Sequence, residues 1–170
     1  MAIEPDTKDW TWVLQRACNE CGFDPADYPP QAISQHHRDA FPRWQRVLER
    51  ADASERADEN AWSGLEYSAH VRDVYLLFTE RTQLMLDEDD PQFENWDQDR
   101  TAEEKNYAAE DPRRVGEELA TAGERYAALL DTVTDWDRTG LRSNGSRFTI
   151  GTLTQYGWHD VVHHLHDVRG

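Results

Sequence analysis

Apolar residues recur at the spacing of an α-helix in four stretches of the chain, and this pattern predicts four helices. The first stretch opens after Pro29 and Pro30 and runs to about Arg50. Pro42 lies inside it, and because proline removes a helical hydrogen bond, we expect a kink or break there. The apolar face of this stretch consists of Phe41, Trp44, Val47 and Leu48.

The second stretch has the clearest start signal. Ser63 and Glu66 have the spacing of a capping box, and Trp62 and Tyr67 have that of a hydrophobic staple. His70 lies at the edge of the apolar stripe that follows, so we expect it to face the core. The stripe itself consists of Tyr67, Val71, Val74, Phe78 and Met85.

Two more helices follow an acidic connection. Residues 87–111 carry eleven Asp or Glu against two Lys or Arg, and they predict a loop or a short helix. Asp111 followed by Pro112 is typical of the start of a third helix. Residues 143–146, Ser-Asn-Gly-Ser, predict a turn, flanked by two short extended pieces. Thr149 then caps a fourth helix that runs towards the terminus.

Four helical patterns predict an all-α fold, a four-helix bundle, within a single domain that spans residues 1–170. Residues 1–30 are expected to be irregular, and residues 31–168 to form the bundle with a short hairpin-like turn before its last helix. Metal sites in bundles are built from inward side chains on facing helices. The histidines of the second and fourth helices are therefore expected to meet.

Composition narrows the class of protein. With 170 residues, 38% hydrophobic and 31% charged, the chain suits one globular domain. The net charge of −16 argues against a nucleic-acid partner, which needs clustered Lys and Arg. No apolar run reaches the ~20 residues needed to cross a membrane, and the first residues lack a signal-peptide pattern. A cytoplasmic location is expected.

The candidate chemistry lies in the last helix, where four of the seven histidines fall between residues 159 and 166. At ~100° per residue, His159, His163 and His166 share a face within ~60°, whereas His164 points away. Two imidazoles at i and i+4 can bind one divalent cation, and an imidazole of another helix would complete a site. Spacing alone leaves the alternative that this face is solvated, and that His70 is a hydrogen-bonded core histidine.

Cys18 and Cys21 form a Cys-x-x-Cys spacing. They are a candidate redox pair, a pair close to the bundle metal, or half of a structural zinc site that needs two more ligands. His36 and His37 fit poorly as those ligands because adjacent helical residues point ~100° apart. The simplest alternative is two reduced cysteines in a packed turn.

The sequence from Trp62 to Val74, WSGLEYSAHVRDV, resembles the second-helix signature of the DinB-like superfamily, in which a Trp-Ser-x-x-Glu segment precedes a metal-binding histidine. His159-x-x-x-His163 is similar to the paired histidines of that family's last helix. The resemblance covers residues from about 30 to 168. It implies a four-helix bundle with a divalent metal held by three histidines, as in mycothiol-dependent maleylpyruvate isomerases and bacillithiol transferases.

Carried over to this sequence, the resemblance implies His70, His159 and His163 as ligands. His166 would be a substitute ligand or a neighbour of the ion, and Asp160 or Asp167 would orient an imidazole by accepting its free N–H. For Asp167, the expectation of a surface charge is preferred. Imidazole ligands suit several divalent ions, and zinc is the first candidate because it is the most available one. Nickel and iron are the alternatives. The N-terminal segment with its two cysteines departs from the family pattern.

The function implied by this resemblance is a thiol-dependent S-transferase or isomerase. The ion would activate a low-molecular-weight thiol towards a small electrophile, and Arg81 would hold a substrate carboxylate or form a surface ion pair. The same site would also suit hydrolysis through an activated water. Non-enzymatic alternatives are a stress-response protein with a structural ion and a metal-free interaction module. A homodimer is left open.

Overall fold

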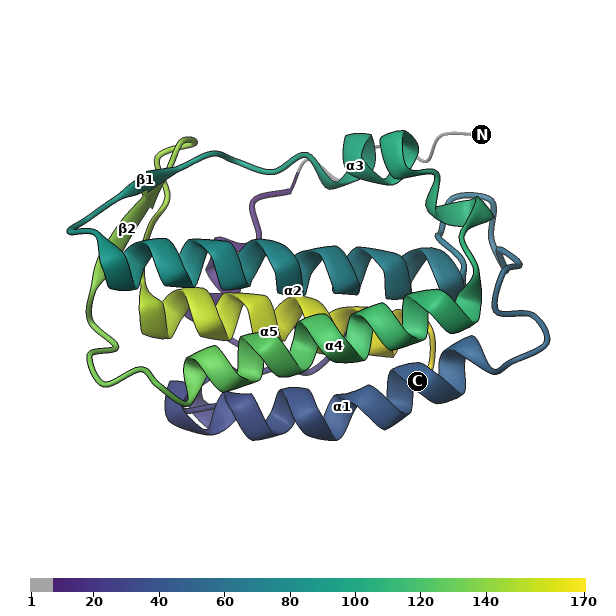
Figure 1. Cartoon of the computed structure of the whole chain (residues 1–170), viewed down its shortest axis with the longest axis horizontal. Coiled ribbons are helices and arrows are strands. Elements are labelled where there is room, and N and C mark those ends of the chain that lie inside the picture. Colours follow the sequence, from purple (N-terminus) through teal and green to yellow (C-terminus); the bar gives the residue numbers. More distant parts are fainter. Residues whose placement is uncertain (1–7) are drawn as a thin grey trace.

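The computed structural model describes residues 8–170, and four long helices dominate it (Figure 1). They are α1 (Ile33–Leu48), α2 (Gly64–Asp87), α4 (Pro112–Leu130) and α5 (Ile150–Asp167). Helix α4 packs against α1 and α2, and α5 packs against the same two helices. The expected four-helix bundle is confirmed. No helix of the described residues is long and apolar enough to cross a membrane.

Local capping signals set the starts of three helices. Ser63 and Glu66 form the reciprocal capping box of α2, and the rings of Trp62 and Tyr67 lie 5.5 Å apart, as the staple predicts. The Asp111 side chain accepts the Arg114 N–H at the start of α4. Helix α5 likewise begins with a box formed by Thr149 and Thr152. These three starts are confirmed.

Pro42 does not break α1, so the expectation of a break is wrong. The helix continues from Ile33 to Leu48 through this residue. Trp44 and Val47, which follow the proline, are buried in the bundle, and α1 packs along α4. Tertiary packing therefore outweighs the loss of one backbone hydrogen bond.

The connections between the long helices add small elements to the bundle. Strand β1 (Gln92–Phe93) pairs in parallel with β2 (Thr139–Arg142), with Gln92 opposite Leu141. Strand β2 pairs antiparallel with β3 (Arg147–Thr149), which forms the expected hairpin before α5. Helix α3 (Gln98–Lys105) and the short 3₁₀ helix η4 (Tyr107–Ala109) occupy the rest of the acidic connection.

The N-terminal segment is better ordered than an irregular chain. It contains three short 3₁₀ helices, η1 (Thr11–Leu14), η2 (Pro25–Asp27) and η3 (Pro30–Ala32), while residues 1–7 of the expected irregular segment lie outside the described part. The side-chain amide of Gln155 on α5 donates to the carbonyls of Pro25 and Tyr28. This segment is therefore fastened along α5.

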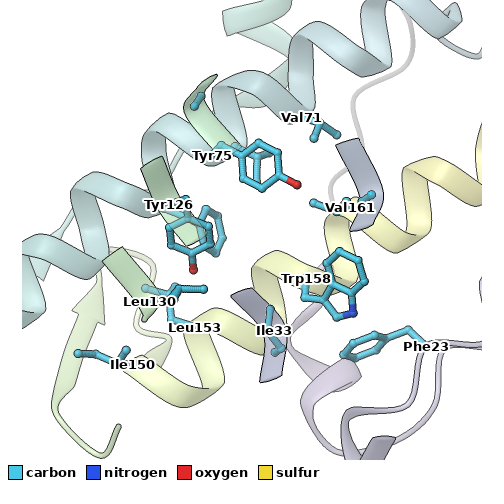
Figure 2. Packing of buried hydrophobic residues seen from close by; sticks show 14 of the residues in the cluster. Phe23, Ile33, Val71, Tyr75, Tyr126, Leu130, Ile150, Leu153, Trp158 and Val161 are labelled. Atoms are coloured by element: carbon cyan, nitrogen blue, oxygen red, sulfur yellow. The ribbon is translucent and has the colours of Figure 1, made fainter. Parts of the chain in front are cut away.

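A large apolar cluster joins the four helices and the N-terminal segment, and a smaller one lies around Leu65 and Tyr107. Figure 2 shows part of the large cluster, where aromatic side chains from three helices and from the N-terminal segment lie together. Tyr75 of α2 faces Tyr126 of α4, and Trp158 of α5 lies near Phe23 of the N-terminal segment. Because Trp158 is buried in this cluster, the rotation of α5 about its axis is fixed. The residues that follow Trp158 therefore point away from the helix face that carries it, at about 100° per residue.

Candidate metal centre

Two clusters of metal-ligating side chains lie beside each other on α5. In the first, His70 of α2 meets Asp160 and His164 of α5, with one ligand atom of each within 4.8 Å of the others. The Nε2 atom of His70 lies 3.2 Å from Asp160 Oδ1. The Nε2 atom of His164 lies 3.7 Å from the same oxygen. Two ring nitrogens thus converge on one carboxylate oxygen.

Aromatic rings hold His70 in place. Its imidazole is fully buried and stacks on Trp96, with ring centroids 5.3 Å apart and planes 9° apart. The Trp62 ring lies 5.3 Å away at an angle of 47°. The Nδ1 atom of His70 has no hydrogen-bond partner among the described residues. Packing, rather than a hydrogen bond to Nδ1, therefore orients the Nε2 atom towards Asp160.

A carboxylate orients the second imidazole. The Nδ1–H of His164 donates to Asp167 Oδ2 over 2.9 Å, which leaves Nε2 for the cluster. The Tyr67 ring packs against His164 with centroids 4.8 Å apart. Burial raises the pKa of Tyr67 to about 12, so its hydroxyl stays protonated. A histidine that donates its other N–H to a carboxylate is the usual arrangement of a metal ligand.

The carboxyl group of the cluster is ionised. Burial opposes its charge, but the neighbouring imidazoles of His70 and His164 outweigh that effect and hold the pKa of Asp160 well below its usual range. An ionised carboxylate and two ring nitrogens form a donor set that suits zinc and other divalent ions. Ligand atoms about 2.1 Å from a tetrahedral ion lie about 3.4 Å apart, close to the two distances found here. The cluster fits a divalent cation.

The second cluster joins α5 to the N-terminal segment. Cys18, Cys21, His159 and His163 each place a ligand atom within 4.8 Å of the others. The Sγ atom of Cys18 lies 3.8 Å from His163 Nδ1. Burial lowers the pKa of His159 to about 4 and also lowers that of His163, so both rings are neutral at physiological pH. Burial also raises the pKa of the Cys21 thiol to about 11.

A cleft of about 450 Å³ opens over the two clusters. Its walls are aromatic and acidic, with Lys8 as the one cationic Lys or Arg side chain among the lining residues of the described part. His70 lies outside the lining, behind Asp160. The lining consists of Lys8, Trp10, Glu20, Asn60, Trp62, Tyr67, Gln98, Asp99, Tyr156, His159, Asp160, His163, His164 and Asp167.

The structure divides the three histidines that were expected to share an ion. His159 and His163 are together but face the cysteines, whereas His70 is grouped with Asp160 and His164. No group within the described chain combines His70 with His159 and His163. Asp160 and His164 form their own i, i+4 pair, turned ~100° from the first, and this face points to α2. The sequence contained this second pair, but its spacing did not show which pair faces His70.

The other candidates also have defined places. His166 is exposed at the end of α5, and Asp167 is an exposed residue, as expected, whose carboxylate also contacts His164. Arg81 is neither in the cleft lining nor in a surface ion pair: it is buried and donates to the carbonyl of Glu94. Its guanidinium lies over the Phe93 ring at 4.8 Å. Burial, reinforced by Arg142, lowers its pKa to about 10.

Comparison with known proteins places this geometry in context. A sequence model of the DinB superfamily matches residues 22–168. Among solved structures, YfiT from Bacillus subtilis, described as a probable metal-dependent hydrolase with an unusual four-helix bundle topology, matches with a TM-score of 0.72. The two chains are 22% identical over 81% of this chain and 82% of YfiT. No curated protein sequence matches the chain significantly.

Proposed function

The chain belongs to the DinB superfamily, and on that premise we propose that it is a metal-dependent enzyme whose ion is held by His70, Asp160 and His164. The observation that carries the proposal is the convergence of two imidazole Nε2 atoms on Asp160 Oδ1, at 3.2 and 3.7 Å. Three protein ligands leave a position for a reactant, as in catalytic zinc sites. Zinc is the proposed ion, with nickel or iron as alternatives.

The ion, when bound, would act as a Lewis acid that lowers the pKa of a nucleophile at the open position. The protein supplies the remaining functions. Asp167 retains the Nδ1 proton of His164, which fixes the tautomer that presents Nε2. The Trp62 and Trp96 rings surround His70 and keep solvent from it. The anion of Asp160 partly neutralises the ion and sets its Lewis acidity.

Water is the nucleophile that this donor set suits best, because two histidines and a carboxylate also form the zinc sites of hydrolytic enzymes. The proposed reaction is therefore hydrolysis of a small substrate held in the cleft. The acidic residues Glu20, Asp99 and Asp167 would repel anionic substrates, and the aromatic walls would hold apolar ones. A neutral or cationic substrate with an apolar body is expected.

A second candidate function is transfer of a low-molecular-weight thiol to a small electrophile. The size of the cleft favours it, because about 450 Å³ lined by Trp10, Trp62, Tyr67 and Tyr156 holds more than a water and a small acyl group. The thiol would lose its proton on binding and become the nucleophile. The two candidates use the same ligands and differ in the nucleophile alone.

Metal analysis and activity of ligand variants test the proposal. We expect Asp160→Asn combined with His164→Ala to lose the metal ion of this group and at least about 100-fold of any metal-dependent turnover. Turnover would be measured with a panel of neutral chromogenic esters and amides, and separately with thiols and a monochlorobimane-type probe. Hydrolysis without added thiol supports the first candidate, and turnover that requires thiol supports the second.

His166→Ala is the matched control, since this histidine lies on the same helix but is exposed. It should keep both the metal content and the activity of the parent protein. Full metal content in the Asp160→Asn/His164→Ala variant would overturn the ligand assignment. Absence of metal-dependent turnover with both panels would favour a non-catalytic, structural ion.

A further inference from the structure

The second cluster has a composition that the proposed enzyme function does not require. We propose that Cys18, Cys21, His159 and His163 form a structural zinc site that fastens the N-terminal segment to α5. Two thiols and two imidazoles make a complete set of four protein ligands, which is typical of structural zinc and leaves no position for a reactant. The cluster is thereby chemically distinct from the neighbouring group with its three ligands.

The turn that carries the cysteines is built to bring the two thiols together. The Cys18 N–H donates to the Phe23 carbonyl over 2.7 Å, and the Gly22 N–H donates to the Cys18 carbonyl over 2.9 Å. Gly22 has φ of +77°, a left-handed conformation that favours glycine. The tight Cys-x-x-Cys-Gly turn therefore holds both sulfur atoms on one side before any ion binds.

Helix α5 supplies the other half of the site. His159 and His163 are one turn apart, and their ring centroids are 5.2 Å from each other. Cys18 Sγ lies 3.8 Å from His163 Nδ1. With zinc–sulfur and zinc–nitrogen bonds of about 2.3 and 2.0–2.1 Å, these atoms would be about 3.6 Å apart in a tetrahedral site. The observed separation is thus close to that of two ligands of one ion.

Two further observations favour a bound ion over simple packing of the side chains. His159 is buried, yet its Nε2 atom has no hydrogen-bond partner among the described residues. His163 directs its other nitrogen, Nε2, towards Glu20 Oε2 at 3.5 Å. A carboxylate beside the nitrogen that does not bind the ion is the usual support of a metal-bound histidine. Glu20 comes from inside the Cys-x-x-Cys turn, so one turn would supply two ligands and this support.

A reduced pair or a disulfide explains these contacts less well. The cysteines are free in the structure. A disulfide between them would close only a short local loop and would leave the two imidazoles facing sulfur without a role. An ion instead joins segments separated by 145 positions in sequence, as measured from Cys18 to His163. The cross-link therefore ties the N-terminal segment to the bundle.

The cross-link also positions one wall of the cleft. Trp10 and Glu20 line the cleft, and the Trp10 ring lies 4.9 Å from that of His163 and 5.5 Å from that of His159. Both residues belong to the segment that the zinc would hold. Loss of the ion should therefore loosen this wall while the ligands of the first cluster stay in place on α2 and α5.

Cobalt substitution of the intact chain tests the proposal. Cobalt bound by cysteine gives a thiolate-to-metal charge-transfer absorption, which a site of two histidines and an aspartate lacks. We expect this absorption in the parent protein and a total of about two equivalents of zinc by elemental analysis. Cys18→Ser/Cys21→Ser should remove the absorption and one equivalent, whereas His166→Ala should preserve both.

A measurement on the parent protein avoids dependence on the folding of variants. Both thiols should react with an aromatic disulfide reagent after chelation of the metal, and at least about 10-fold more slowly in the zinc-loaded protein. Equal reactivity with and without zinc, or a cobalt protein without thiolate absorption, would overturn the proposal. Failure of the first site has a different signature: the thiolate absorption would persist while Asp160→Asn/His164→Ala removed no metal.

Discussion

At the scale of single residues, the bundle keeps a histidine uncharged by burying it away from any carboxylate partner. His37 of α1 is fully buried, and its Nδ1 is hydrogen-bonded to the Tyr75 hydroxyl over 3.1 Å. Desolvation, aided by the neighbouring His36, lowers the pKa of His37 from 6.5 to about 3. The Trp158 ring packs edge-on against it at 5.0 Å. Protonation of this residue is therefore coupled to unfolding.

We expect His37 to make the protein less stable as the pH falls. The unfolded chain binds a proton at this residue below about pH 6.5, whereas the folded protein does so only near pH 3, so acid favours unfolding between these values. The contribution is up to about 1.4 kcal/mol per pH unit. In His37→Asn, which loses this proton uptake, the free energy of unfolding should depend less on pH. Urea unfolding of the chelated protein at several pH values measures this difference.

His166→Asn serves as the control for that comparison because the parent side chain is exposed. Its unfolding free energy should follow the pH dependence of the parent protein. Parallel curves for the parent protein and His37→Asn would show that His37 is not the source of the acid sensitivity.

At the scale of elements, α5 combines ligand placement with close helix packing. Two pairs of candidate metal ligands, each at i and i+4, lie on this helix and are offset from each other by one residue. Gly157 precedes them, and a Cβ at this position would lie 2.7 Å from the Phe78 ring of α2. The close approach at Gly157 helps to set the distance between α2 and α5, and so the distance from His70 to Asp160.

Gly157→Ala should therefore destabilise the protein although alanine is the better helix former. Overpacking costs about 1–3 kcal/mol, which exceeds the gain of up to about 1 kcal/mol from helix propensity. The free energy of unfolding from urea titration measures the net effect. A second change, Phe78→Leu, should recover part of the loss in the double variant. An increase in stability for Gly157→Ala alone would contradict this account.

The helix starts and the bundle could be predicted because their causes are local. Ser63 and Thr149 lie next to the backbone groups that they cap, and the helical spacing of apolar residues predicted four helices. The continuation of α1 through Pro42 could not be predicted, because it depends on the packing of α1 on α4. The partners of His70 could not be predicted from the sequence either, because they depend on the rotation of α5 relative to α2. Likewise, the contact of Cys18 with His163 depends on the path of the whole N-terminal segment.

At the scale of the whole molecule, negative charge is the dominant electrostatic property. The chain carries 34 acidic and 18 basic residues, a net charge of −16. Some acidic side chains are paired, as where buried Arg72 contacts Asp73, Glu110 and Glu118. The excess of negative side chains causes mutual repulsion, which opposes the compact state. Acidic side chains also line the cleft.

We expect the melting temperature of the chelated protein to rise when sodium chloride increases from about 20 mM to about 500 mM, because salt screens repulsion between exposed charges. Each kcal/mol gained would appear as about 2–4 °C in a protein of this size. Scanning calorimetry measures the shift. A fall in melting temperature would show that attraction within ion pairs outweighs the repulsion.

The variant Glu59→Gln/Glu103→Gln provides the matching test, since both parent side chains are exposed acids. Removal of two negative charges should raise the melting temperature at low salt, and the benefit should shrink at high salt. A benefit that is independent of salt would point to a local cause.

Asp167 lies within reach of both clusters, 2.9 Å from His164 Nδ1 and 4.0 Å from His163 Nε2. The two contacts use different oxygens of this carboxylate, Oδ2 for His164 and Oδ1 for His163. Two ions bound at the proposed sites would therefore share one carboxylate, and their like charges would repel each other. The expected result is negative cooperativity, and thermodynamic reciprocity requires each ion to weaken the other's binding by the same factor.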